Sequence, residues 1–347
     1  MRKVTLFSVA SSCLLTAIVP SVAGADTDRE FQLCTATGSG SGPNVIECVD
    51  RTGALTQSVS TGGNGSVASG GNAGGLSQRG DQVLAVNTAS GNATRFRVRA
   101  GRLERPELLS SGGTPVSGAL GRGAYVLTTT ELVHFSDDAL TPDSSEPLLL
   151  GDGSAAQVVV TADYAYVSEK NGSLEAFRLG EDGRVVGRAR SVAGVTPGVI
   201  VGIAAQGNVV VAPIAHLASN PGQSEIDIVR GLGVVAYEAT SQVATCWADS
   251  DDRRACITNP GSHTISCGRV DVTGLREITE VAAEDAGESQ FDIALRDSVV
   301  GVLVKSPEGV FSLHSYELGG GDQLSSIGET PIGLAANGAV LLPSLRR

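Results

Sequence analysis

The side chains best suited to chemistry in this 347-residue chain stand at the ends of short apolar runs. Glu169 and Lys170 follow the run Tyr166-Val167-Ser168, and Lys305 follows Val302-Leu303-Val304. Lys170 and Lys305 are the only lysines beyond residue 3, which favours a specific use for both. A carboxylate, an ammonium or an imidazole so placed can act as general base, general acid or hydrogen-bond donor. The candidate catalytic residues are Glu169, His216, Lys305 and His263.

A second set of polar and aromatic residues is suited to binding a small molecule. The Trp247 ring could stack on a ligand, although packing against neighbouring strands is an equal use for a tryptophan. For each charged residue the plainer alternative is a solvated loop side chain. The candidate substrate-binding residues are Asn87, Lys170, Trp247, Gln290 and Asp292.

Motifs for several well-known chemistries are absent from the sequence. It has no Gly-x-Ser-x-Gly nucleophile elbow, no Walker loop and no His-Glu-x-x-His. The four histidines are scattered and the cysteines lack Cys-x-x-Cys spacing, so we expect no zinc site. The run Asp249-Ser250-Asp251-Asp252 is faintly like a calcium loop, but we interpret it as a tight turn between two strands. We expect no metal and no cofactor.

The N-terminal residues indicate the secretory pathway. Arg2 and Lys3 precede an apolar stretch at 4–19, and Ala23-Gly24-Ala25 has the small-x-small pattern of a signal-peptidase site. A membrane anchor is the alternative, but the stretch is shorter than the ~20 apolar residues that span a bilayer. We therefore expect a signal peptide at 1–25, a single domain at 26–347, and a secreted protein with no membrane association after cleavage.

The net charge and the glycosylation sequons indicate which kinds of binding partner and which source suit this protein. The chain has 37 acidic and 25 basic residues and a net charge of −12, which repels phosphate backbones and makes nucleic acid an unsuitable partner. We expect a monomer that binds a small-molecule substrate. Sequons at Asn64, Asn92 and Asn171 would accept glycans in a eukaryotic secretory pathway, which favours a fungal source.

Cysteine spacing predicts two hairpin disulfides. Cys34 and Cys48 are equidistant from a Gly-Ser turn, so they face each other across a hairpin. Cys256 stands opposite Cys267 about one turn and opposite Cys246 about another. We expect Cys34–Cys48, and a bond from Cys256 to one of its two neighbours, with Cys267 favoured.

The chain repeats one unit of short β-branched strands separated by Gly, Asp, Asn and Pro. A period of about 40–45 residues is typical of four-stranded propeller blades. Most units carry an aromatic residue on the third strand. Those aromatic residues are Phe96, Phe135, Phe177, Tyr237 and Tyr316. The first turn of each unit recurs at Gly80, Gly123, Asp163, Gly207, Asp252, Asp297 and Gly338.

The two ends of the chain complement each other. The last unit stops soon after Gly338, and the piece from Phe31 to Leu55 begins in the middle of a unit. Together they predict an all-β, seven-bladed β-propeller closed by pairing of the N- and C-terminal strands, which removes exposed sheet edges. The glycine-rich stretch 58–75 is interpreted as a long surface loop between the first and second blades.

Several segments resemble the lactonase-like seven-bladed propellers, a group that includes 6-phosphogluconolactonase and the fungal carboxy-muconate lactonizing enzyme. These segments are Ala244-Thr245-Cys246-Trp247, Asp252-Arg253-Arg254, Ile257 to Ser262, Tyr166 to Lys170, Val98 to Leu103 and Gly333 to Ala336. The resemblance covers nearly the whole chain from about residue 30. It implies His, Glu and Arg at the channel mouth, and Glu169 matches the Glu. Asn259-Pro260 stands where the Arg is implied, and Pro115-Val116-Ser117 where the His is implied.

Three functions fit these observations. The favoured one is a metal-independent enzyme that performs a cyclisation or pericyclic step (hetero-Diels–Alderase-like) on a secondary metabolite in the propeller channel, because positioning and hydrogen bonding suffice for such reactions. The alternatives are a lactone hydrolase that pairs Glu169 with His216 or His263, and a non-catalytic ligand-binding propeller. A wide apolar channel would favour the first and a plugged channel the last.

Overall fold

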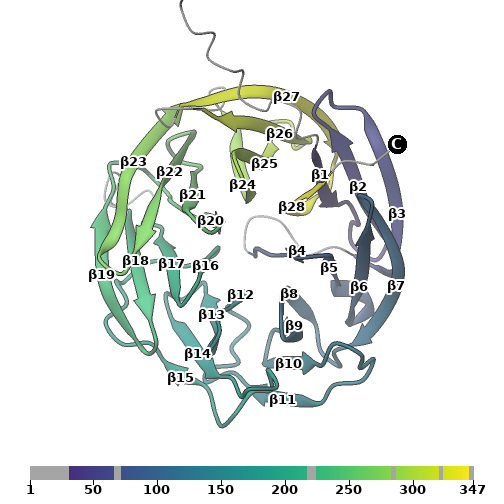
Figure 1. The fold of residues 1–347 in the computed structure, drawn as a ribbon, viewed down its shortest axis with the longest axis vertical. Helices are drawn as coiled ribbons and strands as arrows, with labels where there is room; N and C mark the ends of the chain where they lie inside the picture. The colour runs from purple at the N-terminus through teal and green to yellow at the C-terminus, as the bar shows by residue number, and fades with distance from the viewer. Residues whose placement is uncertain (1–30, 66–71, 217–223, 283–286, 320–322, 344–347) are drawn as a thin grey trace, which may run out of the picture.

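The computed structural model describes residues 31–65, 72–216, 224–282, 287–319 and 323–343. Within them the chain forms seven four-stranded antiparallel sheets, which stand as blades around a central channel (Figure 1). Short runs of Val, Ile, Leu and aromatic residues broken by Gly and Asp turns produce these strands. The predicted all-β seven-bladed propeller is confirmed. No helix among the described residues has the length and apolar character needed to cross a membrane.

Each blade runs from an innermost strand at the channel to an outermost strand at the rim, and its strands are named in that order. Blade 1 contains β28 (Asn337–Pro343), β1 (Phe31–Ala36), β2 (Pro43–Asp50) and β3 (Leu55–Asn64). Blade 2 contains β4 (Leu76–Arg79), β5 (Gln82–Asn87), β6 (Asn92–Arg99) and β7 (Arg102–Ser110), and blade 3 contains β8 (Pro115–Gly121), β9 (Gly123–Thr128), β10 (Glu131–Phe135) and β11 (Ser144–Pro147). Blade 4 contains β12 (Ala155–Val160), β13 (Tyr164–Glu169), β14 (Leu174–Arg178) and β15 (Arg190–Ser191).

The remaining three blades follow the same pattern. Blade 5 contains β16 (Ala204–Gln206), β17 (Val209–Ile214), β18 (Glu225–Arg230) and β19 (Gly233–Ala239). Blade 6 contains β20 (Trp247–Ser250), β21 (Arg254–Asn259), β22 (Thr264–Asp271) and β23 (Gly274–Ala282), and blade 7 contains β24 (Ser289–Arg296), β25 (Val299–Lys305), β26 (Phe311–Leu318) and β27 (Leu324–Gly333). One short 3-10 helix, η1 (Thr88–Ser90), connects β5 to β6.

The ring closes in blade 1, where strands from the two ends of the chain pair. β1 is antiparallel to the C-terminal β28 on one side, with Cys34 opposite Val340, and to β2 on the other side. Leu341 and Leu342 are buried in the closing strand. The predicted closure is therefore confirmed. The expected signal peptide, residues 1–25, lies outside the described residues.

Two details of the predicted repeat are wrong. Gly338 does not form a turn, because it lies within the inner strand β28 at φ +78°, where a Cβ atom would come 2.2 Å from the nitrogen of Leu76. Tyr237 does not lie on a third strand but on the outer strand β19, and it is 69% exposed. The third strand of blade 5 is β18, and the connection before it, 215–224, is longer than the connection between second and third strands in any other blade. That longer connection displaced the repeat by one strand.

Both expected disulfides are present. Cys34–Cys48 joins directly opposed residues of β1 and β2, and Cys256–Cys267 joins β21 to β22. Cys246 is the one cysteine of the described residues outside a disulfide, and it is buried. Two disulfides are consistent with an oxidising compartment and hence with secretion.

Adjacent blades pack through apolar side chains that fill the space between neighbouring sheets. Between blades 3 and 4, for example, Tyr125 and Leu127 of β9 contact a cluster that includes Val167 and Phe177. These side chains are fully buried. Such packing fixes the inner strands around the axis, so that their side chains define the channel.

Candidate functional site

A short segment, Asn72–Gly75, crosses the end of the channel at which the inner strands begin. We call these four residues the plug. Ala73 is 1% exposed, and its nitrogen donates to the carbonyl oxygen of Ala156 in blade 4 at 3.3 Å. The nitrogen of Gly74 donates to Asp292 Oδ2 in blade 7 at 3.1 Å, and its carbonyl oxygen accepts from Gly118 in blade 3 at 3.0 Å. The plug is thus bonded to three blades around the axis.

Three side chains predicted to bind substrate hold the plug, namely Asp292 as described above, Trp247 and Lys170. Trp247 Nε1 donates to the carbonyl oxygen of Asn72 at 3.4 Å, and Lys170 Nζ donates to Asn72 Oδ1 at 3.1 Å. Gly74 has φ +67°, and a Cβ there would lie 2.8 Å from Ser117 Oγ, so glycine is required. The prediction that stretch 58–75 is a surface loop is therefore wrong at both ends, because residues 58–64 lie on the outer strand β3 and the last four residues form the plug. Their carbonyl and amide groups find partners inside the channel, which lets them stay buried.

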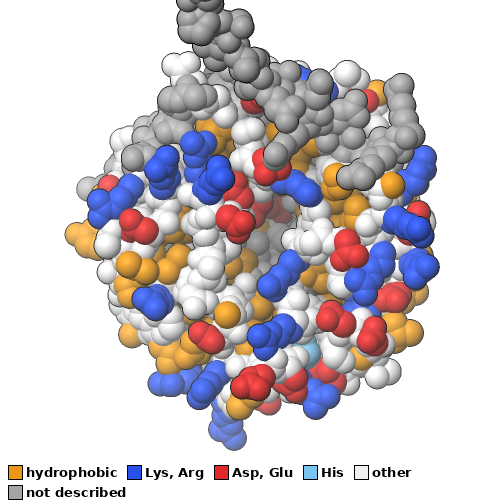
Figure 2. Space-filling model, in the orientation of Figure 1, with side chains coloured by type: hydrophobic (Ala, Val, Ile, Leu, Met, Phe, Trp, Pro, Cys, Tyr) orange, Lys and Arg blue, Asp and Glu red, His pale blue; other side chains and the backbone are white. Residues whose placement is uncertain are grey.

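Beyond the plug the channel contains a cavity of about 700 Å³ that extends to the ends of the inner strands. Figure 2 shows a hollow at the centre of the ring with both cationic and anionic side chains around it. The polar side chains that line the cavity and carry ionisable or amide groups are Gln78, Arg79, Gln157, Asn208, Asp249, Asp252, Asp292 and Arg296. Gly, Ala, Val, Ile and Leu residues of the inner strands make up much of the remaining wall, but polar atoms contribute more of the cavity surface than apolar atoms do.

Two carboxyl groups of this cavity have strongly perturbed acidity. Asp292 on β24 accepts hydrogen bonds from the nitrogens of Gly74 and of its neighbour Ile293, and burial raises its pKa to about 7. Asp249 on β20 accepts from the nitrogen of Leu295 at 2.7 Å. Burial, with a smaller contribution from the nearby Asp292 charge, raises the pKa of Asp249 to about 7. Desolvation disfavours the ionised form of each group, and the pair repel when both are ionised.

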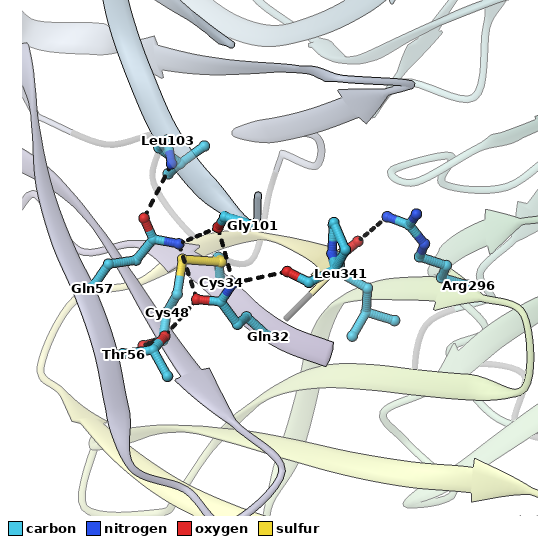
Figure 3. Close-up of a disulfide and its surroundings, with 10 residues drawn as sticks. Gln32, Cys34, Cys48, Thr56, Gln57, Gly101, Leu103, Arg296 and Leu341 are labelled. Carbon is cyan, nitrogen blue, oxygen red and sulfur yellow. Dashed lines mark hydrogen bonds between the residues drawn. A yellow bond between two sulfur atoms is a disulfide. The ribbon is translucent and has the colours of Figure 1, made fainter. Parts of the chain in front are cut away.

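Two arginines stand at the open end of the cavity and bridge neighbouring blades. Arg79 Nη1 donates to the carbonyl oxygen of Leu120 at 3.5 Å, and Arg296 Nη1 donates to that of Leu341 at 3.0 Å, a contact drawn in Figure 3. Both arginine side chains are exposed. Each keeps further N–H groups that can reach a ligand.

Of the residues predicted from sequence, Asp292 alone lines this cavity. Asn87 is fully buried within blades 1 and 2, where it bonds Asn44, Thr61 and Thr94. Its location identifies it as part of a structural network. Among the polar cavity residues that the sequence did not identify, Asp249 is the one with the strongly raised pKa; the sequence assigned it to a turn, whereas it lies on the inner strand β20. A carboxylate on an innermost strand was the signal that could have identified it.

The predicted catalytic residues are placed apart from the cavity. Glu169 is fully buried at the end of β13 and accepts from Ser154 Oγ at 3.1 Å. His216 Nε2 is buried and has no hydrogen-bond partner among the described residues. Lys305 Nζ lies 5.3 Å from the ring of Phe311.

The remaining predicted residues also lie outside the cavity lining. His263 Nδ1 bonds the carbonyl oxygen of Glu288, and Gln290 is fully buried with neither amide atom bonded among the described residues. No hydrogen bond between described residues joins Glu169 to either His216 or His263. The pairing expected for a lactone hydrolase at this end of the channel is therefore not formed in this structure.

The three sequons differ in accessibility. The side chains of Asn64 and Asn171 are exposed, whereas that of Asn92 is half-buried and accepts a hydrogen bond from Asn87. Asn171 Nδ2 donates to Ser154 and Glu169. Glycosylation at all three positions remains a prediction.

Comparison with known proteins shows the fold and no more. No protein-family model matches the chain, and no curated protein matches it by sequence. Among solved structures it is similar to a putative 6-phosphogluconolactonase from Bacteroides fragilis (14% identity, 91% of this chain and 99% of that one, TM-score 0.60). A periplasmic gluconolactonase from Pseudomonas aeruginosa gives 14% identity, 91% and 100% coverage and a TM-score of 0.59. A hydrazine synthase from Kuenenia stuttgartiensis gives 11% identity, 76% and 88% coverage and a TM-score of 0.58. The chain therefore shares its propeller fold with lactonases and with proteins of unrelated chemistry.

Proposed function

We propose that this protein is a hydrolase that opens the ring of a small polar lactone in the channel cavity, with Asp249 and Asp292 as its acid and base. The observation that carries the proposal is that two interacting carboxyl groups, each with its pKa raised to about 7, line one cavity. Titratable groups with such perturbed pKa values concentrate at functional sites. The lactonase names of two solved structures with the same fold support the choice of substrate class.

The chemistry needs one carboxylate and one carboxylic acid, and two carboxyl groups that each have a pKa of about 7 supply both near neutrality. The ionised partner takes a proton from water as the water attacks the lactone carbonyl. The protonated partner donates its proton to the ring oxygen as the C–O bond breaks. Because the two groups repel when both are ionised, one proton stays on the pair over a range of pH around neutrality.

A pericyclic or cyclisation step, which the sequence alone favoured, receives less support from this geometry. Such reactions suit a wide apolar channel, whereas this cavity is polar and the plug closes one end of the channel. A propeller that binds a ligand without transforming it is the second candidate. The plug favours this binding function, because hydrogen bonds to its main chain close one end of the channel and a ligand can then enter and leave only at the other end.

The test measures lactone hydrolysis by the purified protein with a panel of aldonolactones. Each hydrolysis releases a proton from the new carboxylic acid, so the rate is followed as acidification of a weak buffer, and the spontaneous rate without protein is subtracted. Asp249→Asn keeps an oxygen that can accept from the nitrogen of Leu295, so the fold should persist. We expect it to lower kcat by about 10²–10⁴. Asp252→Asn, at the exposed edge of the same cavity, is the matched control and should change kcat by less than about threefold.

The pH profile adds a second criterion. We expect kcat/KM to be bell-shaped with its maximum near neutrality, since the pair must hold one proton. Calorimetric binding of a lactone with no turnover in the parent protein would establish the binding-only alternative. Turnover that is unchanged in Asp249→Asn and Asp292→Asn would refute the assignment of the acid and base.

A further inference from the structure

Two glutamates that the proposed reaction does not use are buried together between blades 3 and 4. Glu169 at the end of β13 is 0% exposed, and Glu175 on the neighbouring strand β14 is 1% exposed. Because Glu175 stands opposite Val167, two residues before Glu169, the two glutamates point to the same side of the sheet. That side packs against blade 3, where Val167 belongs to one apolar cluster with Leu127 and Leu132. We call Glu169 and Glu175 the carboxyl pair.

Hydrogen bonds account for three of the four oxygens of the pair. The nitrogen of Leu149 donates to both oxygens of Glu175, at 3.1 and 3.0 Å. Glu169 Oε2 accepts from Ser154 Oγ and from Asn171 Nδ2, each at 3.1 Å. Glu169 Oε1 is buried and receives no hydrogen bond from any described residue. A buried carboxylate oxygen without a donor is costly, so this atom indicates a missing hydrogen.

No cation among the described residues faces the carboxyl pair. Lys170 Nζ bonds Asn72 and the carbonyl oxygen of Ala155. The described residues contain no group of three or more His, Cys, Asp and Glu arranged to hold a metal ion. Several other titratable groups lie on the surrounding elements. Asp152, Arg178 and Arg190 are exposed, and Glu146 on β11 and Tyr164 on β13 are half-buried. Glu131 bonds Ser145, while Tyr125, Tyr166 and His134 bond Gly183, Gly231 and Asp143.

We propose that the carboxyl pair shares one proton, and that this proton acts as a pH-sensitive fastening between blades 3 and 4. The acid of Glu175 donates to Glu169 Oε1 and so supplies the missing hydrogen, while Glu175 continues to accept from the nitrogen of Leu149. The fastening includes the connection from β11 to β12, because Leu149 and Ser154 both lie on it. When the proton leaves, two carboxylates face each other in an apolar cluster and the connection loses its attachment.

Electrostatics supports the same conclusion and fixes the sign. Burial, and then the charge and hydrogen bond of Glu169, raise the pKa of Glu175 from 4.5 to about 7. The folded protein therefore holds a proton that the unfolded chain releases above pH 4.5. The stabilisation is complete below that value, falls as the pH rises, and is lost once the pH passes about 7.

The experiment compares thermal unfolding of the parent with Glu175→Gln from pH 5 to pH 8.5. The glutamine amide can donate to Glu169 Oε1 and its oxygen can accept from the nitrogen of Leu149 at every pH. We expect the variant to melt within about 1 °C of the parent at pH 5 and about 5 °C above it at pH 8. Glu131→Gln is the matched control, since its carboxylate bonds the hydroxyl of Ser145 on the neighbouring strand, and it should follow the parent at every pH.

Two results would overturn the proposal. One is an unchanged difference between Glu175→Gln and the parent at pH 5 and pH 8, which would mean that no proton is involved. The other is stabilisation of the parent by millimolar Ca²⁺ at pH 8 that Glu175→Gln lacks, which would mean that a cation and not a proton joins the two groups. Hydrogen exchange at the amide of Leu149 would locate the fastening at this connection. In the parent, exchange should become faster between pH 6 and pH 8 by more than the intrinsic pH effect, and in Glu175→Gln it should not.

Discussion

Removal of the Cys34–Cys48 disulfide tests how the ring is closed. β1 is the strand on which closure depends, because it pairs with β28 on one side and with β2 on the other. The disulfide joins β1 to β2 at directly opposed residues whose side chains are 0% exposed. Figure 3 shows it beside Gln32, whose side chain donates to the carbonyl oxygens of Gly101 in blade 2 and Pro343 in β28. The double variant Cys34→Ala/Cys48→Ala leaves that glutamine network in place.

The expected magnitude follows from the loop that the disulfide closes. The two cysteines are 14 residues apart, and a cross-link of that length restricts the unfolded chain by about 3 kcal/mol. A typical free energy of unfolding is about 5–15 kcal/mol, so the loss is a large share. Cys256→Ala/Cys267→Ala removes a cross-link of 11 residues within blade 6, for which the same relation also gives about 3 kcal/mol. The second variant is therefore a control of equal chain entropy that lies away from the closing strand.

The assay is denaturant unfolding of both double variants, followed by hydrogen exchange under native conditions. We expect both to lose about 3 kcal/mol, and only Cys34→Ala/Cys48→Ala to exchange faster at the amides of β28. Leu342, on β28, is the most informative position because its side chain is fully buried. Equal protection of β28 in both variants would refute the view that the first disulfide secures the closure. A loss below about 1 kcal/mol in both would refute the entropic estimate itself.

Three further predictions follow from burial and backbone geometry. Leu342→Ala should lower the free energy of unfolding, measured by denaturant unfolding, by about 2–5 kcal/mol, because the leucine side chain is 0% exposed in the closing strand. The control Leu108→Ala should lower it far less, because Leu108 is 48% exposed. Gly74→Ala should destabilise the protein and weaken ligand binding measured by calorimetry, because a Cβ would meet Ser117 Oγ at 2.8 Å and φ is +67°. Cys246 should resist iodoacetamide in the folded protein and react after unfolding, as judged by mass spectrometry, because burial raises the pKa of its thiol to about 12.

Local patterning was sufficient to predict the fold because each blade repeats the same arrangement of strands and turns. The turns at Gly80 and Gly207 lie directly after inner strands, and Phe96 and Phe177 lie on third strands, as the repeat predicted. Hairpin symmetry identified Cys34–Cys48 without any long-range information. The errors arose where the repeat is irregular. The long connection in blade 5 displaced Tyr237, and a glycine needed for close approach of β28 to β4 was mistaken for a turn.

The candidate site was harder to predict because its position depends on a contact that no local pattern records. The sequence predicted functional side chains at the ends of apolar runs, and two of the predicted binding residues, Asp292 and Trp247, lie near the end of the channel where inner strands begin. What the sequence did not reveal is that the last four residues of the glycine-rich stretch return across the axis and are bonded there by side chains from three blades. Once the plug is in place, Trp247 at the beginning of β20 has a main-chain partner and not a ligand. Asp292 bonds the plug through one oxygen and still lines the cavity. The accessible chemistry then moves to side chains further along the same strands. Asp249 on β20 is the clearest case, because its carboxyl group reaches the cavity from the middle of a strand whose first residue, Trp247, supports the plug.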